Sequence, residues 1–396
     1  MSQNKKISMR PVSIIGVGCT PFGKSDSSII DLAIQSSVEA INSANVKYDD
    51  IQSIYLGNFV GERLANQGSL GAMLADRLDI SDIPATKTEG ACASGGIAFR
   101  HAFLTIALGL YDFVLATGVE KMTSSSTPDV TAALATAGDM EMEMYAGLTF
   151  PGAFAMIMAS HMQKYGTTRE QIASVSVKNH RNGTNNPKAM FQKEINVEDV
   201  ITSREISEPI RLFDCPPISD GAASVLLCPT EIAKNFVNNP VNILGSGHAS
   251  GPISLSGMKD LTSFSATAIA ANEAYAMSGL RAKDIDVIEV HDCFSIAEII
   301  ALEDLGFFNK GEGGPATESG ITALNGKYPT NPSGGLIAKG HPVGATGIAQ
   351  IYELTKQLQG LSTNQTNDPE TALAHNLGGL GALSTVHILG KTNGTK

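Results

Sequence analysis

The chain has 396 residues, of which 42% are apolar and only 17% are charged. Its length predicts more than one core-forming unit, and its apolar content excludes an intrinsically disordered chain. The net charge of −11 argues against a general nucleic-acid-binding protein, which would need a basic face. Few charges and 40 glycines indicate that much of the chain is buried, in a large core, in an oligomer interface or in both.

The cysteines favour neither a zinc site nor a disulfide framework. Their number is odd, and the sequence contains no Cys-x-x-Cys motif. Reduced thiols in a cytoplasmic protein are the simplest interpretation. The first apolar stretch, residues 12–17, is short and contains Gly16, so it predicts a strand and not a signal peptide. No apolar run reaches the length of about 18 residues that a membrane span needs. The five cysteines are Cys19, Cys92, Cys215, Cys228 and Cys293.

Two stretches that lie far apart in the chain resemble each other. Residues 12–18 (VSIIGVG) are similar to residues 241–247 (VNILGSG), and each is a β-branched run that ends in a glycine turn. This pattern predicts a buried strand in each place. A helix with small residues on one face is expected after each strand, over residues 31–44 and 265–278.

The resemblance between the two regions continues in the same order. The further matching pairs are residues 49–56 with 283–290, 93–98 with 344–349, and 113–118 with 371–376. The first and last of these pairs lead into strands, and the middle pair opens an apolar helix. Strands that alternate with helices predict the α/β class, with a mostly parallel sheet covered on both faces. Two copies of the pattern predict two α/β halves related by a pseudo-two-fold axis.

The domain organisation follows from this repeat. We expect residues 1–119 and 213–235 to form the first half and residues 236–396 to form the second. Residues 120–212 have no counterpart in the second half and are expected to form an inserted loop domain. An insertion of this size is usually a lid or a binding loop, and surface decoration or an interface arm is the alternative. Its Met-rich segment, residues 139–144, either lines a flexible apolar site or packs in the ordinary way.

Cys92 stands in a setting that favours reactivity. It lies in the segment GACASGG, residues 90–96, just before a glycine-rich helix start. The unpaired N–H groups and the dipole of a helix N-terminus favour a thiolate, so we expect the Cys92 pKa to be lowered. The alternative is a buried structural cysteine, which is the commoner fate of this residue type.

Three further segments carry chemically useful side chains beside glycine-rich turns. They are HDCF at residues 291–294, GHPVGATG at residues 340–347 and HNLGGLG at residues 375–381. In open α/β sheets, functional sites gather beyond the carboxyl ends of the strands, and all four segments are expected there. Three histidines and two cysteines at such junctions are harder to explain as structural residues than one histidine would be.

These segments, together with DCPPISDGAAS at residues 214–224, resemble the thiolase superfamily. The resemblance covers nearly the whole chain, from about residue 12 to residue 389, and GHPVGATG is its most specific element. The chain is most similar to the archaeal and sterol-carrier-protein-type thiolases. It has HDCF where the better-known branch has Asn-Glu-Ala-Phe, and HNL where that branch has Cys-x-Gly. The usual second catalytic cysteine is therefore absent, and Cys293 is its natural substitute.

The resemblance implies a thiolase-like five-layer fold and reversible Claisen condensation, most simply of two acetyl-CoA molecules to acetoacetyl-CoA and CoA. It implies that Cys92 is the nucleophile that becomes acylated and that His341 activates it. Cys293 is expected to be the base that removes the α-proton, because a thiol titrates closer to neutrality than a lysine. His341 and His291 are expected to donate hydrogen bonds to the enolate oxygen. Coenzyme A is expected as substrate and product, with no permanently bound cofactor and no metal.

A second oxyanion hole is expected from the backbone N–H of Cys92 and one N–H of the Leu377–Gly378 turn. His375 and Asn376 either orient this loop or have a structural role. The residues that contact coenzyme A are not determined by the sequence, which has no phosphate-binding GxxxxGK[ST] loop. The resemblance points to the insertion for this site. The candidates in the insertion are His161, His180, Arg181 and Lys188, among which the sequence does not choose. His248, beyond the second repeat's first strand, either faces the pocket or has a capping or packing role.

Two other functions compete with a thiolase. A related condensing enzyme, such as a ketoacyl or hydroxymethylglutaryl-CoA synthase, is disfavoured by GHPVGATG and by the paired cysteines. A non-catalytic acyl-CoA- or lipid-binding thiolase-like protein, or a scaffold subunit of a condensing complex, would be consistent with the missing Cys-x-Gly cysteine. The resemblance also implies a homodimer or homotetramer, and an assembly with hydroxymethylglutaryl-CoA synthase and a zinc-ribbon acyl-CoA-binding protein. Neither nucleic acid nor a membrane is expected as a partner.

Overall fold

The computed structural model describes residues 9–392. Its strands are β1 (Val12–Cys19), β2 (Ser53–Gly57), β3 (Ala85–Thr88), β4 (Val114–Glu120), β5 (Glu205–Ser207), β6 (Ile210–Arg211), β7 (Gly221–Pro229), β8 (Val241–Ser250), β9 (Val287–Glu289), β10 (Thr371–Gly378) and β11 (Leu383–Lys391). Its helices are α1 (Ile29–Ala44), α2 (Gly61–Leu64), α3 (Leu70–Arg77), α4 (Ser94–Ala107), α5 (Thr127–Leu134), α6 (Phe150–Tyr165), α7 (Arg169–Thr184), α8 (Val197–Thr202), α9 (Thr230–Ala233), α10 (Ser265–Ser278), α11 (Ser295–Asp304), α12 (Gly313–Glu318), α13 (Gly335–Lys339) and α14 (Thr346–Gln359). None of these helices combines the length and the apolar character needed to cross a membrane.

Nine of these strands form one mixed sheet in the order β3-β2-β4-β7-β1-β8-β11-β10-β9. Only the outer pairs, β2 with β3, β2 with β4 and β9 with β10, are parallel. Every pairing between β4 and β10 is antiparallel. The expectation of a mostly parallel sheet is therefore wrong. The reason is that β10 and β11 are joined by a short turn without a crossover helix, and β7 returns antiparallel after the insertion.

The order of the strands is symmetric about the β1–β8 pair at its centre. β7 lies next to β1 as β11 lies next to β8, and β4 and β10 follow at mirrored positions. The strands that the sequence repeat paired, residues 12–18 with 241–247 and 113–118 with 371–376, occupy these mirrored positions. On this symmetry we propose that the chain divides into halves and an insertion at the boundaries expected from the sequence.

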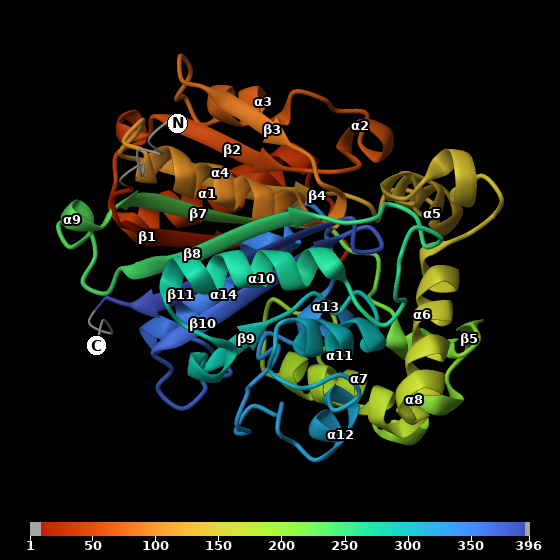
Figure 1. Cartoon of the computed structure of the whole chain (residues 1–396). Coiled ribbons are helices and arrows are strands. Elements are labelled where there is room, and N and C mark those ends of the chain that lie inside the picture. The colour runs from red at the N-terminus through yellow and green to blue at the C-terminus, as the bar shows by residue number, and fades with distance from the viewer. Residues whose placement is uncertain (1–8, 393–396) are drawn as a thin grey trace, which may run out of the picture.

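Helices cover the sheet in layers (Figure 1). α1 packs on β1 and β7, and α10 packs on β8 and β11, so these two helices form the outer layers. α4 and α14 contact each other and pack on strands of both halves, which makes them the inner layer. Their apolar side chains join those of the strands in one core, which includes Phe99, Ile106, Ile348 and Leu354. The layers are therefore α1, the strands of the first half, α4 with α14, the strands of the second half, and α10. This is the expected α/β fold with five layers.

The glycines of the sequence repeat have a different role from the one expected. Gly16 and Gly247 do not form turns, because β1 and β8 continue through them. A Cβ atom on Gly16 would lie 2.1 Å from the backbone oxygen of Ala40, in α1. A Cβ atom on Gly247 would lie 1.8 Å from the backbone oxygen of Ala270, in α10. The repeated glycines therefore allow the two outer helices to lie directly against the strands.

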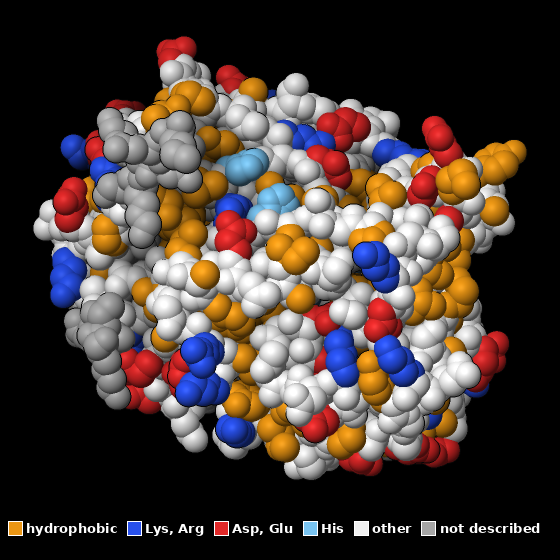
Figure 2. Space-filling model, viewed as in Figure 1, with side chains coloured by type: hydrophobic (Ala, Val, Ile, Leu, Met, Phe, Trp, Pro, Cys, Tyr) orange, Lys and Arg blue, Asp and Glu red, His pale blue; other side chains and the backbone are white. Residues whose placement is uncertain are grey.

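The insertion lies to one side of the sheet, together with helices of the second half (Figure 1). α7 packs on α11, α12 and α13, and α6 packs on α11. One core joins the two segments and includes Phe154 and Ile157 from the insertion and Phe294 and Leu336 from the second half. On the face seen in Figure 2, basic side chains are interspersed with acidic ones, so this face carries no continuous basic surface.

We predict that Gly247→Ala destabilises the protein by about 1–3 kcal/mol, because the new methyl group overlaps the α10 backbone. Without that overlap, alanine in a strand would stabilise the fold slightly. Gly68→Ala is the matched control, since the nearest atom to its Cβ is the flexible Glu62 side chain at 3.7 Å. Urea unfolding of both variants tests this prediction. A Gly247→Ala variant as stable as the control would contradict the close contact.

Candidate active site

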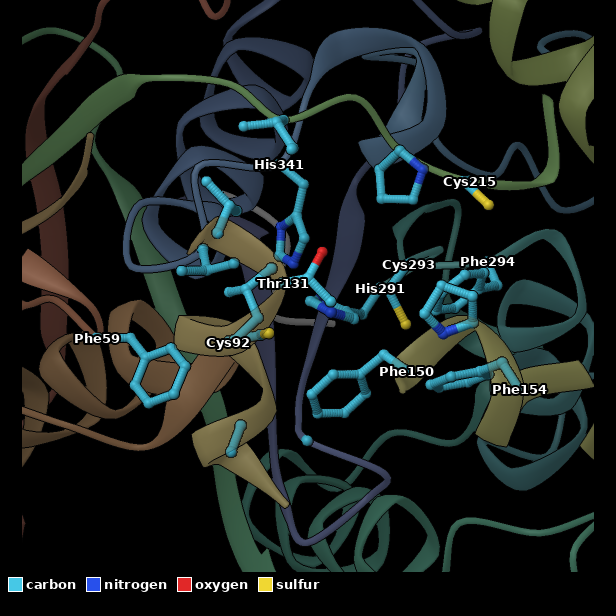
Figure 3. A pocket seen from close by; sticks show the side chains of 18 residues that line it. Phe59, Cys92, Thr131, Phe150, Phe154, Cys215, His291, Cys293, Phe294 and His341 are labelled. Carbon is cyan, nitrogen blue, oxygen red and sulfur yellow. The ribbon is translucent and has the colours of Figure 1, made fainter. Parts of the chain in front are cut away.

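A cavity of about 170 Å³ lies where loops of both halves meet the insertion. Figure 3 shows the side chains of Cys92, His291, Cys293 and His341 directed into one space, with aromatic rings around it. Cys92 follows β3, and His291 and Cys293 follow β9, as expected for strand ends. His341 differs, because it lies in the loop between α13 and α14. The insertion contributes apolar wall residues from α5 and α6, among them Val130, Leu134, Phe150 and Phe154.

The surroundings of Cys92 raise the pKa of its thiol to about 12, mainly because the thiol is removed from water. The expectation of a lowered pKa is therefore wrong. The thiol does lie just before the first turn of α4, and two backbone N–H groups are aimed at it, its own and that of Gly379. Their effect is smaller than the desolvation cost of a charged sulfur in this cavity. Cys92 therefore rests as a neutral thiol.

The backbone donor opposite Cys92 belongs to Gly379 and not to the Leu377–Gly378 segment. Gly378 is still part of the β10–β11 ladder, where it is paired with Leu383. Gly379 is the first residue beyond the strand, has a φ of +61° and lines the cavity. This backbone conformation suits glycine and turns its N–H toward the sulfur. The backbone N–H aimed at the sulfur is thus one residue beyond the expected Leu377–Gly378 turn, and Gly378 as an oxyanion donor stays a prediction.

His341 is held at both its backbone and its ring. Its backbone N–H donates to Ser219 Oγ at 2.7 Å, and its ring Nδ1 lies 2.7 Å from Thr346 Oγ1. The Thr346 hydroxyl also donates to the Pro342 carbonyl, so its single proton is used there. Nδ1 must then donate to Thr346, which leaves a lone pair on Nε2. Burial lowers the pKa of His341 to about 3, so the ring is neutral at rest.

His291 and Cys293 complete the group of reactive side chains. A ring nitrogen of His291, a ring nitrogen of His341 and Cys92 Sγ all lie within 4.8 Å of one another. The two imidazole rings meet edge to face, with their centres 4.9 Å apart. Burial lowers the pKa of His291 and raises that of Cys293 well above its ordinary value. Cys293 therefore also rests as a thiol.

Asn376 and His375 point to different surroundings. Asn376 Nδ2 donates to the Cys92 carbonyl at 3.0 Å and lies 3.1 Å from His291 Nδ1, so Asn376 contacts the reactive group directly. His375 is fully buried on the other side of β10, where its Nε2 lies 3.0 Å from Thr267 Oγ1. His375 is not among the residues that line the cavity.

Glu120 is a residue of this site that the sequence reasoning missed. It is fully buried at the end of β4 and accepts hydrogen bonds from Asn58 Nδ2 at 2.7 Å, Phe59 N at 3.0 Å and Gly344 N at 3.2 Å. It therefore ties the loop after β2 to the loop that carries His341. Burial raises the pKa of its carboxyl group to about 7. An acidic residue at the end of an otherwise apolar strand was the available signal.

The residues suggested for coenzyme A do not line this cavity. His161 is buried against Glu303, and Lys188 contacts the Cys19 carbonyl. Arg181 borders a separate polar cavity beside α7 and α12. His180 stacks on Phe191, and His248 lies on β8 beside Glu273. In the Met-rich segment, Met140 and Met142 are exposed and only Met144 is buried.

Comparison with protein families agrees with this geometry. The thiolase N-terminal domain matches residues 12–231, and the thiolase C-terminal domain-like family matches residues 247–391. The chain belongs to the thiolase family, and it is an acyltransferase, as its motifs predicted.

Individual relatives agree with this assignment. The chain is 47% identical to an acetyl-CoA acetyltransferase of Methanothermobacter thermautotrophicus, over 97% of this chain and 100% of the relative. It is 36% identical to sterol carrier protein 2 of Bos taurus, over 94% of this chain and 71% of the relative. These similarities confirm the expected archaeal and sterol-carrier-protein-type branch.

A solved structure shares the same fold. The structure of an Ltp2-ChsH2(DUF35) aldolase superposes with a TM-score of 0.86 at 25% identity, and the match covers 98% of this chain and 100% of the other. The expected thiolase-like fold class is therefore confirmed along nearly the whole chain.

Proposed function

We propose that the chain catalyses the reversible condensation of two acetyl-CoA molecules to acetoacetyl-CoA and CoA, through an acetyl group carried on Cys92. The observation that carries this proposal is that the Cys92 and Cys293 thiols and two neutral imidazoles face one small, largely apolar cavity. The name of the archaeal relative, an acetyl-CoA acetyltransferase, supports the choice of substrate.

The first step is the transfer of an acetyl group to Cys92. The Cys92 proton passes to the lone pair on His341 Nε2 while the sulfur attacks the thioester carbonyl. The carbonyl oxygen becomes negative and accepts hydrogen bonds from the backbone N–H groups of Cys92 and Gly379, which in the resting site are aimed at the neighbouring Cys92 sulfur. Collapse breaks the bond between the carbonyl carbon and the CoA sulfur.

The departing CoA sulfur needs a proton, and Cys293 supplies it. Cys293 rests as a thiol because burial raises its pKa well above the ordinary value. After it protonates CoA, Cys293 is a thiolate in a dry cavity and His341 is an imidazolium. A high pKa, which makes Cys293 a poor base at rest, makes it a strong base at this stage.

The second step forms the carbon–carbon bond. The Cys293 thiolate takes the α-proton of a second acetyl-CoA, and the enolate oxygen accepts hydrogen bonds from His291 and protonated His341. The enolate carbon attacks the acetyl carbonyl on Cys92, and the bond from that carbon to the Cys92 sulfur breaks. The Cys92 thiolate then recovers its proton from His341, so all groups return to their starting state.

The dimensions of the cavity support short acyl groups. Its volume of about 170 Å³ lies below the roughly 300–1,000 Å³ typical of pockets for drug-sized ligands. Aromatic rings of Phe59, Phe150 and Phe154 form much of its wall, which favours an apolar acyl chain. Coenzyme A acts as substrate and product, and no permanently bound cofactor or metal takes part in the steps above.

The chain acts as a homodimer or homotetramer in this proposal. The edge of β3 that faces away from β2 has no partner within the described chain, which supports pairing with a second copy. Light scattering of the purified protein should give two or four times 41.4 kDa, and a mass of 41.4 kDa would contradict the oligomer.

The larger assembly and the location belong to the same proposal. The DUF35 component named in the similar aldolase structure supports a zinc-ribbon acyl-CoA-binding partner, with hydroxymethylglutaryl-CoA synthase as the next enzyme. Five free cysteines support a reducing, cytoplasmic location. Copurification of the chain with both proteins from the native cell tests the assembly. If the two proteins do not copurify with the chain at native concentration, the assembly is contradicted.

We predict that acetyl-CoA adds about 42 Da to the wild-type protein, at Cys92. Cys92→Ala should take no acetyl group. Cys293→Ala should still become acetylated at Cys92, but more slowly, because the departing CoA loses its proton donor. It should form acetoacetyl-CoA at least about 10²-fold more slowly, because it also lacks the base. Intact-protein and peptide mass spectrometry measure the adduct, and a coupled assay measures the product.

Cys215→Ala is the matched control, since this third thiol lines the same cavity and has no role in the steps above. It should acetylate and condense like the wild type. An acetyl group on Cys215 in place of Cys92, or full condensation by Cys293→Ala, would overturn the assignment.

A further inference from the structure

Asn376 lies where the catalytic segments of both halves meet. Its side chain is buried, and the backbone around it consists of the first turns of α4 and α14. A Cβ atom on Gly347 would lie 2.3 Å from Asn376 Oδ1, and one on Gly96 would lie 3.1 Å from it. Glycine at these two positions therefore leaves the space that the Asn376 amide occupies.

The orientation of the Asn376 amide is determined by two neighbours of opposite kind. Its Oδ1 accepts from the Gly96 backbone N–H at 3.2 Å, and a backbone N–H can only donate. Its Nδ2 donates to the Cys92 backbone carbonyl at 3.0 Å, and a carbonyl can only accept. The reverse orientation would place like groups together at both ends. The atom that faces His291 is therefore the amide nitrogen, which carries protons.

This orientation determines which nitrogen of the His291 ring carries the proton. Asn376 Nδ2 lies 3.1 Å from His291 Nδ1, so Nδ1 must accept a hydrogen bond and must be unprotonated. A neutral imidazole carries its proton on the other nitrogen, which is Nε2. The ring is neutral because it is fully buried and lies beside His341 and His375. His291 therefore presents a donor, and His341 presents a lone pair.

We propose that Asn376 is a positioning residue that holds His291 in the Nε2–H tautomer, so that His291 donates to the enolate oxygen. This inference rests on the proposed function and deepens it. It also explains a second property of the site. Cys92, His291 and His341 are close enough together to bind a metal ion, but a His291 ring with its proton on Nε2 has no free lone pair for one, because Nδ1 already accepts from Asn376. The Asn376 amide thus favours a His291 ring that donates from Nε2 to the enolate oxygen and disfavours metal binding by that ring.

Asn376→Asp is the sharpest test, because it keeps the size of the side chain and replaces the donor with an acceptor. A neutral His291 ring would then carry its proton on Nδ1, and Nε2 would lose its donor role. The titratable groups around this ring are Cys92, Cys293 and His341, which line the cavity with it, and His375, which acts on its charge from the other side of β10. The new carboxylate raises the His291 pKa, and protonation below that pKa restores the Nε2 donor. We expect condensation to fall by about 10²-fold at pH 8 and to recover as the pH is lowered.

Cobalt binding reports the tautomer of the His291 ring without any catalytic turnover. Cobalt(II) chloride added to Asn376→Asp at pH 8 should give a thiolate-to-cobalt absorption band, because Cys92, His291 and His341 all offer lone pairs. Zinc chloride should inhibit this variant at a concentration at least tenfold lower than the wild type. The control is the same substitution in a His291→Gln background, where the pH dependence and the cobalt band should both be absent.

The outcomes separate this inference from the proposed function. A uniform loss of activity at every pH, with no cobalt band, would show that Asn376 is only structural and would overturn the inference. If Asn376→Asp does not fold, the ring ¹⁵N shifts of His291 in the unaltered protein decide, and an Nδ1–H tautomer overturns the inference. If Cys92 takes no acetyl group, the proposed function fails, whereas the cobalt and ¹⁵N measurements still judge the tautomer.

Discussion

The active site depends on the direct contact between the backbones of α4 and α14 at their first turns. A Cβ atom on Gly95 would lie 2.8 Å from the Gly344 carbonyl oxygen, and one on Gly347 would lie 2.3 Å from the Gly96 nitrogen. Side chains at these positions would separate the helices. Because Cys92 immediately precedes α4 and His341 lies just before α14, this contact brings a thiol from one half against an imidazole from the other. The pseudo-symmetry of the fold thereby produces an asymmetric pair of reactive groups.

The same close packing removes the reactive groups from water, and their chemistry follows from that. Burial raises the pKa of both thiols and lowers the pKa of both imidazoles, so each group rests in its neutral form. Charges then arise only while protons move during the reaction, opposite backbone donors and imidazoles that are already in place. Glu120 helps to keep these groups in place, since it accepts hydrogen bonds from the loop after β2 and from the loop that carries His341. In the proposed reaction, catalysis therefore depends on preorganised neutral groups and not on a resting thiolate.

Much of this fold could be predicted from the sequence, because the repeat and its glycines are local patterns. The paired strands, the helix at residues 265–278, the helix that opens at residues 344–349, and the four motif segments were all recognised. The sheet direction was not, because β11 follows β10 through a short turn without a helix, and β7 returns antiparallel to β4 after the helices of the insertion. The raised thiol pKa could not be predicted either, since it depends on aromatic side chains from α6 and on other segments far from Cys92 in sequence. The Asn376 amide orientation likewise required the three-dimensional contacts with Gly96 and Cys92.

The central claim is that the two thiols divide the reaction, with Cys92 carrying the acyl group and Cys293 moving the α-proton. The most direct measurement is deuterium incorporation into the methyl group of acetyl-CoA in D₂O, followed by NMR beside acetyl exchange into isotope-labelled CoA. We predict that Cys293→Ala still exchanges acetyl groups with CoA and incorporates methyl deuterium at least about 10²-fold more slowly than the wild type. Deuterium incorporation by Cys293→Ala at the wild-type rate would contradict this division of roles.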